Sequence, residues 1–494
     1  MNPEDNITKL KIDSEESGQK IIENKELNIW EALIPVVILM AMLAYNIFFV
    51  EGQELLGTYT NQYILLTAGG VAAIVGFFNK VSLQLMISEI WENLKSVFVP
   101  ILILFLVGAL AGTWLVSGII PAMVYYGLQV LSPSIFLPAS VIIAAIISIA
   151  TGSSWTTSAT VGIALVGIGS ALGIPSGMIA GAVISGAYFG DKMSPLSDTT
   201  NLAPAMAGTD LFTHIRYMAF TTVPTIIITL IVFSILSMNI ETTGSADISG
   251  LLNSIDTTFN ITPYLFTVPF VVIVLIVTKT KPLIALGVGV VLAAIFAFIF
   301  QSEVLNSIST SNIKSIVNAI FVDTEITTDN VSLNKLFSAG GMKGMIWTIL
   351  LIMSAMVFGG VMDAIGALAR ITKELLKLAT SVFGLFASTV FSCLGLNAIA
   401  SDQYLALVIP GKMFKKAYED RGLAPENLSR TLEDSGTVTS VLIPWNTCGA
   451  YQSSVLGVDT FSYAGYAIFN YLSPFMTLLF AAFSIKIRQL KDSK

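Results

Sequence analysis

Long runs of apolar residues, separated by short polar connections, occupy most of the chain from residue 29 to residue 485. Runs such as 29–50, 96–117, 217–238 and 345–367 are each long enough to cross a hydrocarbon layer about 30 Å thick. They are apolar on every side of a helix, as lipid or a surrounding helix bundle requires. The pattern predicts an all-α polytopic membrane protein.

The composition agrees with this class and limits the available chemistry. Of the 494 residues, 54% are hydrophobic and 12% are charged, whereas soluble domains carry roughly a quarter charged residues. Cys393 and Cys448 lie in apolar stretches, so we expect neither a disulfide framework nor a zinc site. His214 is the only histidine, and we interpret it as a loop residue at the inner interface. We expect the lipid bilayer as a partner, with no nucleic acid and no cofactor.

Lysine and arginine in short connections indicate the cytoplasmic side of a membrane protein. By this rule the polar tail 1–28, the terminal segment 486–494 and the connection that contains Lys281 lie in the cytoplasm. The loop 239–262 and the polar stretch 301–344 lie outside. The sequence thus predicts a multi-pass protein of the inner (plasma) membrane with both termini in the cytoplasm.

The apolar stretch 380–411 has positive charges on both sides, at Lys377 and Lys412, so both of its ends are cytoplasmic. With about 32 residues and a polar interruption at 397–402, it cannot hold two full spans. We therefore predict a re-entrant hairpin here. In the first half of the chain, the charges allow either three full spans between residues 134 and 210 or a hairpin followed by one span.

The two halves share a pattern of polar interruptions. Each has an apolar stretch with a polar tip, followed about forty residues later by a span that polar residues and prolines interrupt. Aligning Asp191 with Asp434 also places Ser194 opposite Thr437 and Ser197 opposite Ser440. Because the charges orient the halves oppositely, we predict two inverted-topology repeats. The first, within 29–238, has hairpin 134–172 and broken helix 176–210; the second, within 263–485, has hairpin 380–411 and broken helix 431–457.

The tips and breaks offer the chemistry of a small cation site. Their hydroxyl, amide and carbonyl oxygens are the ligands that hard cations prefer, and the helix ends add partial charges. Asp191 and Asp198 lie within a predicted span, where a charge costs at least about 2.5–3.5 kcal/mol. Because burial favours a protonated carboxyl and a bound cation favours the ionised form, such a group can hold either H⁺ or Na⁺. Lys192 is positioned to neutralise a neighbouring carboxylate when no cation is bound.

The acidic residues also have structural interpretations. Asp191 and Asp198 could form a hydrogen-bonded helix break with no ligand. Glu433 and Asp434 could lie at the cytoplasmic mouth of the bundle, and Asp363 could cap a helix or form a pair within it.

The string 190–205, Gly-Asp-Lys-Met-Ser-Pro-Leu-Ser-Asp-Thr-Thr-Asn-Leu-Ala-Pro-Ala, resembles the signature of the NhaC family of Na⁺/H⁺ antiporters. The tip 151–158 and the string 440–451 are similar to the same family, and the resemblance covers the chain from about residue 30 to residue 485. It implies a two-repeat transporter of the ion-transporter superfamily, with a scaffold, a mobile transport domain and an elevator-type movement. Antiporters of this build are often homodimers.

The resemblance also implies a set of candidate ligands for a transported Na⁺ in the first break. Further candidates come from the two tips and the second break. By resemblance the first ligands are Asp191, Ser194, Asp198, Thr200 and Asn201. The tips and the second break add Ser153, Ser154, Thr157, Asn397, Asp402, Asp434, Thr437 and Asn446.

These features favour a secondary active transporter that exchanges cytoplasmic Na⁺ for external H⁺. The alternative is Na⁺-coupled exchange or uptake of a small organic anion or amino acid, as in similar proteins that exchange malate for lactate. The absence of arginine from the polar tips favours simple cation exchange. An intramembrane aspartyl protease is disfavoured, because Tyr188 replaces the first glycine of the Gly-x-Gly-Asp motif. A channel is also disfavoured, because inverted repeats with hairpins suit alternating access.

Overall fold

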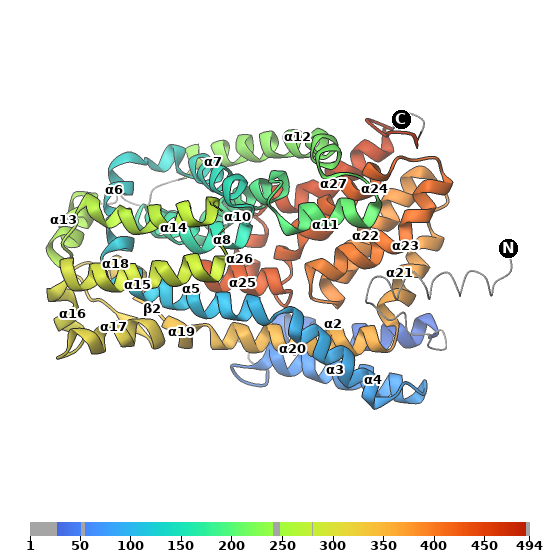
Figure 1. Ribbon diagram of the computed structural model, residues 1–494, viewed down its shortest axis with the longest axis horizontal. Helices are drawn as coiled ribbons and strands as arrows, with labels where there is room; N and C mark the ends of the chain where they lie inside the picture. The colour runs from blue at the N-terminus through green and yellow to red at the C-terminus, as the bar shows by residue number, and fades with distance from the viewer. Residues whose placement is uncertain (1–26, 51–54, 241–247, 279, 491–494) are drawn as a thin grey trace.

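The computed structural model describes residues 27–50, 55–240, 248–278 and 280–490, and it is almost entirely helical (Figure 1). The elements of the first half are α2 (Ile29–Phe49), α3 (Thr60–Phe78), α4 (Leu83–Ser96), α5 (Phe98–Val116), α6 (Ile119–Val130), α7 (Pro133–Thr151), α8 (Ser154–Thr157), the π-helix η2 (Ser158–Gly162), α9 (Ile163–Ala171), α10 (Ser176–Met193), α11 (Asp198–Ala207) and α12 (Leu211–Met238).

The second half contains more short elements. They are α13 (Ile248–Thr258), η3 (Pro263–Phe266), α14 (Thr267–Val277), α15 (Pro282–Phe300), α16 (Ser302–Ile308), α17 (Asn312–Phe321), β1 (Thr324–Glu325), α18 (Val331–Leu336), β2 (Ser338–Ala339), α19 (Gly341–Gly344), α20 (Ile346–Ala364), α21 (Ala367–Lys377), α22 (Val382–Ile399), α23 (Gln403–Asp420), α24 (Pro425–Leu432), the π-helix η4 (Glu433–Thr437), η5 (Ser440–Leu442), α25 (Thr447–Leu456), α26 (Thr460–Ala464) and α27 (Ile468–Ala482).

The helices include several that match the thickness of a membrane. Among the described residues, eight helices are long and apolar enough to cross a bilayer, or nine if the bent pair of α13 with η3 and α14 forms one span. Large apolar side chains on their outer faces are solvent-exposed in the isolated chain; Phe78, Phe270 and Ile299 are 81%, 66% and 65% exposed. Such a surface requires lipid, so the chain is a multi-pass membrane protein.

The polar stretch 301–344 is more structured than a loop. It contains α16 to α19 and a two-stranded antiparallel sheet, in which Thr324 pairs with Ala339. Ile316, Leu333 and Phe337 from this stretch are buried. Leu333 and Phe337 are four residues apart, a helical spacing that the polar average of the stretch conceals.

The interpretation of His214 as a loop residue is wrong. The Asp210 side chain accepts a hydrogen bond from the Thr213 N–H at 2.9 Å, and this cap starts α12 at Leu211. His214 therefore lies in the first turn of α12 and is fully buried, with Nδ1 2.8 Å from the Ser429 hydroxyl of α24.

The central helix of the fold is α10, which packs along α7 and against α26 and α27. Small residues allow this close approach. A Cβ on Gly186 would lie 2.2 Å from the Val141 carbonyl oxygen, and one on Gly190 would lie 2.4 Å from that of Ala145. Small residues at helix contacts are typical of membrane bundles. This packing carries the end of α10 to the end of α7, where both helices stop.

Each polar tip turns through one left-handed residue and then a capping residue. After α7, Gly152 has φ +69° and Ser153 caps α8. After α22, Ser401 has φ +59° and Asp402 caps α23. The two helix–tip–helix units lie in opposite halves of the molecule, with α7 in one half and α22 in the other (Figure 1).

The two helix breaks differ in length. The first covers four residues, from Ser194 to the capping residue Ser197, before α11 begins. The second extends from η4 through η5 to Asn446, which caps α25. The alignment of the two strings places Ser440 opposite Ser197, but the residue that caps the resumed helix in the second break is Asn446.

Candidate functional site

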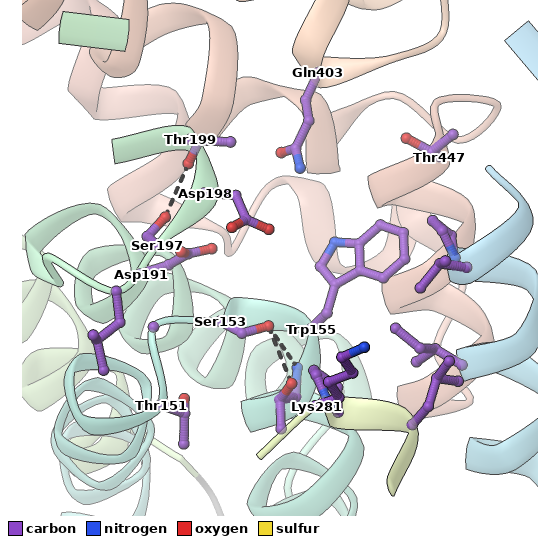
Figure 2. A pocket seen from close by; sticks show the side chains of 18 of the residues that line it. Thr151, Ser153, Trp155, Asp191, Ser197, Asp198, Thr199, Lys281, Gln403 and Thr447 are labelled. Carbon is purple, nitrogen blue, oxygen red and sulfur yellow. Dashed lines mark hydrogen bonds between the residues drawn. The ribbon is translucent and has the colours of Figure 1, made fainter. Parts of the chain in front are cut away.

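A cavity of about 760 Å³ lies where the first tip, the first break and the second tip meet. Its walls also include the start of α5 and the connection from α14 to α15. Figure 2 shows several of its polar side chains. The polar and charged residues of the lining are Ser96, Thr151, Ser153, Thr156, Asp191, Ser197, Asp198, Thr199, Thr280, Lys281, Asp402, Gln403, Tyr404 and Thr447.

Asp191 joins the first tip to the first break. Its Oδ2 accepts a hydrogen bond from the Ser154 N–H at 3.1 Å and another from the Ser154 hydroxyl at 2.7 Å. Ser154 begins α8, whose N-terminal end carries partial positive charge that stabilises a carboxylate. Asp191 is 9% exposed, and it lines the cavity. The structure thus brings together two polar strings that are about forty residues apart in the chain.

Asp198 is more exposed to solvent than Asp191. It is the first residue of α11, is exposed, and lines the cavity. Its neighbour Ser197 caps the helix and lies 3.2 Å from the Thr199 hydroxyl. Asp198 and Gln403 border the same space (Figure 2).

Asp402 contributes the carboxylate of the second tip. It is 7% exposed and lines the cavity. One oxygen, Oδ1, accepts hydrogen bonds from the N–H groups of Tyr404 at 2.8 Å and Leu405 at 3.1 Å. These bonds begin α23, so Asp402 acts both as a helix cap and as part of the cavity wall.

Asp434 does not lie at the mouth of the bundle. It is fully buried and forms an ion pair with Lys192, which is also fully buried. The second oxygen of Asp434 accepts hydrogen bonds from Thr221 at 2.8 Å and from Thr477. Lys192 also donates to the Ser473 hydroxyl at 3.1 Å. Two charges can remain in this interior because they neutralise each other and their remaining sites are bonded.

Other predicted ligands of the first repeat stabilise the backbone. Ser194 donates to the Ile149 carbonyl at 2.8 Å, and Thr200 donates to the carbonyls of Asp191 and Lys192 at 3.2 and 3.1 Å. Thr157 donates to the Ser153 carbonyl at 2.9 Å, and the exposed Asn201 donates to those of Pro195 and Ser197 at 3.0 and 2.7 Å. None of these four residues lines the cavity.

The predicted ligands of the second repeat tie the second tip to the second break. Asn397 donates to the Gly436 carbonyl at 2.6 Å, and Asn446 donates to the Asn397 carbonyl at 3.0 Å. Both side chains are fully buried. Thr437 is also buried, and its hydroxyl has no hydrogen-bond partner among the described residues.

Several residues of the cavity wall were not predicted from the sequence. Lys281 was assigned to a cytoplasmic connection, yet it lines the cavity with Thr280. Trp155 stacks on Tyr451 of α25, with ring centroids 3.9 Å apart and an interplanar angle of 18°. No local signal identifies Thr280 and Lys281, because their positions depend on contacts between distant segments, whereas Trp155 belongs to the tip 151–158 that the sequence singled out.

A cation in this site would depend on oxygen ligands from several residue types. In the described ranges, no three side chains of His, Cys, Asp or Glu come together as metal ligands. Hydroxyl and carbonyl groups at the tips would therefore have to complete any coordination shell around Asp191 or Asp198.

Comparison with known proteins identifies the family. A protein family described as "Na+/H+ antiporter family" matches residues 186–485, which make up more than half of the chain. The chain is 38% identical to the Na⁺/H⁺ antiporter NhaC of Alkalihalophilus pseudofirmus over 84% of this chain and 89% of that protein.

Two further relatives are named for organic solutes. The malate-2H⁺/Na⁺-lactate antiporter of Bacillus subtilis is 35% identical over 86% of this chain and 88% of its own length. The arginine/ornithine antiporter ArcD of Halobacterium salinarum is 36% identical over 77% of each chain. The relatives are transporters rather than enzymes, and the chain belongs to the NhaC family of Na⁺/H⁺ antiporters.

Proposed function

We propose that this protein exports cytoplasmic Na⁺ in exchange for external H⁺ by alternating access. The observation that carries the proposal is the position of Asp191 and Asp198 on one cavity wall, beside the hydroxyls of the first tip. These two carboxylates are the proposed sites at which Na⁺ and H⁺ compete.

The exchange follows from charge neutrality in a poorly hydrated site. A carboxylate in the interior of a membrane protein is stabilised either by a proton or by a cation, and the two exclude each other at one oxygen. Ser154 supplies two hydrogen bonds to Asp191 but no charge. Na⁺ bound there would be released when a proton takes its place.

The direction of transport is supported by the surroundings of the cavity. Ser96 follows Lys95, and Thr280 precedes Lys281, so this side of the cavity is bordered by two positively charged connections. Such connections favour the cytoplasmic side. We infer that the cavity opens to the cytoplasm, where Na⁺ would enter.

The inverted repeats and the elevator-type movement are part of the same proposal. Support comes from matched backbone features in the two halves. In each half, a 19-residue helix ends before a left-handed glycine, Gly118 with φ +78° or Gly366 with φ +74°, and a shorter helix follows. The tips also match, because Gly152 and Ser401 are both left-handed.

Vesicle exchange with Asp191→Asn and Asp198→Asn tests the proposal. We expect at least one variant to lose tenfold or more of Na⁺-dependent proton movement, because asparagine cannot take up or release the proton. The matched control is Asp323→Asn, whose carboxylate lies in an exposed ion pair with Lys343 far along the chain. Wild-type exchange in both variants would contradict the proposal.

A second candidate is Na⁺-coupled exchange of a small organic solute. The cavity volume of about 760 Å³ favours it, because a dehydrated Na⁺ fills only a small part of that space. Lys281 and Asp198 on its walls offer both signs of charge, and the Trp155 ring offers an apolar surface. Proton movement driven by Na⁺ alone supports the first function, whereas movement that requires added malate, lactate or a basic amino acid supports the second.

A further inference from the structure

Glu433 is a buried carboxylate that the predicted set of ligands omits. It begins the π-helix η4 and is fully buried. Its Oε1 accepts a hydrogen bond from the Thr199 hydroxyl at 3.1 Å, while its Oε2 has no partner among the described residues. A buried carboxylate oxygen without a partner is costly, so either a proton or a bound cation must satisfy it.

The same segment contains a second buried oxygen that lacks a close hydrogen-bond partner. The Thr437 hydroxyl is buried beside the Glu433 carboxyl but has no close hydrogen-bond partner in the described part of the chain. Residues four apart in a helical segment lie on neighbouring turns, so Glu433 and Thr437 can contribute to one site. Single-turn π-helices are frequent at functional sites.

The charges around Glu433 leave it without a counterion. Its electrostatic neighbours are Asp191 and Lys192. The Lys192 ammonium is already bonded to Asp434 and Ser473, and Asp191 is itself acidic. No ion pair to Glu433 exists among the described residues. An ionised Glu433 therefore favours an added cation.

Hydroxyl groups connect Glu433 to the cavity. Ser197 and Thr199 both line the cavity, and their hydroxyl oxygens are 3.2 Å apart. Thr199 then donates to Glu433. A cation that leaves the cavity along this side would meet oxygen atoms at each step.

We propose that Glu433, Thr437 and Thr199 form a second, inner Na⁺ site behind the cavity. This inference rests on the proposed transport of Na⁺, and it adds a site separate from that of Asp191 and Asp198. All three donors are oxygen atoms, which suits a small alkali cation.

Equilibrium binding of radioactive Na⁺ to the purified full-length protein tests the inner site. In the double variant Asp191→Asn/Asp198→Asn, we expect residual Na⁺ binding. Adding Glu433→Gln or Thr437→Val should weaken that residual binding at least tenfold, because the first change removes a negative charge and the second removes a hydroxyl ligand. Thr372→Val is the matched control, since Thr372 is buried in α21 and bonds only its own helix, to the Leu368 carbonyl.

The outcomes separate the two proposals. If the wild-type protein binds Na⁺ but moves no protons in response, the proposed antiport fails while the inner site is still measured by binding. If wild-type exchange is present and the residual binding is unaffected by both Glu433→Gln and Thr437→Val, the inner site is overturned. Thr437→Val keeps the size of the side chain, so it remains informative if Glu433→Gln does not fold.

Discussion

At the scale of single residues, the tips depend on backbone conformations that few residues adopt. Gly152 and Ser401 are both left-handed, and each directly precedes the residue that caps the next helix. The first position also has no room for a side chain. A Cβ on Gly152 would lie 2.6 Å from the Cβ of Leu196 and 2.7 Å from the Leu196 carbonyl carbon. The first tip therefore packs against the first break at a position where there is room only for glycine.

We expect Gly152→Ala to lower the midpoint of thermal unfolding and to reduce exchange. The left-handed conformation costs roughly 1–2 kcal/mol for an L-residue, and the contact with Leu196 adds to this cost. Ser401→Gly is the matched control, because Ser401 already adopts φ +59° and glycine relieves that strain. Thermal unfolding in detergent measures both. Equal effects of the two substitutions would show that the conformation at Gly152 does not matter.

At the scale of elements, one ion pair joins the two broken helices. Lys192 lies in the last turn of α10, and Asp434 lies in η4 after α24. Thr221 of α12 and Thr477 of α27 also bond to Asp434, so four elements meet at one carboxylate. The pair couples the interrupted helix of one half of the chain to that of the other.

Removing one partner of this pair should destabilise the protein more than removing both. We expect Lys192→Met or Asp434→Leu alone to cost about 3–5 kcal/mol in the free energy of unfolding, because the other charge stays buried. In the double variant, we expect much of this loss to be recovered, since no unpaired charge remains. A double-mutant cycle of denaturant unfolding in detergent measures the coupling. Additive losses would mean that the two charges do not depend on each other.

At the scale of the whole molecule, the proposed opening of the cavity can be probed with cysteines. Cys393 and Cys448 are both fully buried, so the wild-type background should be low. We expect an impermeant maleimide to label Ser96→Cys and Thr280→Cys in inside-out vesicles, and Ser338→Cys only in right-side-out vesicles. Ser96 and Ser338 are both exposed, which makes the two reporters comparable. Labelling of Ser96→Cys only from the outside would reverse the proposed orientation.

The helical membrane architecture and the family could both be predicted from the amino-acid sequence. Lipid imposes these features locally, because each apolar run must be helical and must match the membrane thickness. The string 190–205 is likewise continuous in the chain, so its resemblance to NhaC proteins is readable without a structure. Residues of the first tip and the first break were assigned to one set of ligands, and Ser154 of the tip bonds Asp191.

Which acidic residues share a site depends on how distant helices pack. Asp434 pairs with Lys192, 242 residues away, while Asp191, Asp198 and Asp402 line the cavity. The sequence left Asp434 and Glu433 between an intramembrane role and the cytoplasmic mouth, and both are fully buried. The physical reason is that the surroundings of a charge are set by whichever distant helices pack around it, and the pattern of apolar and polar residues along one helix does not contain that information.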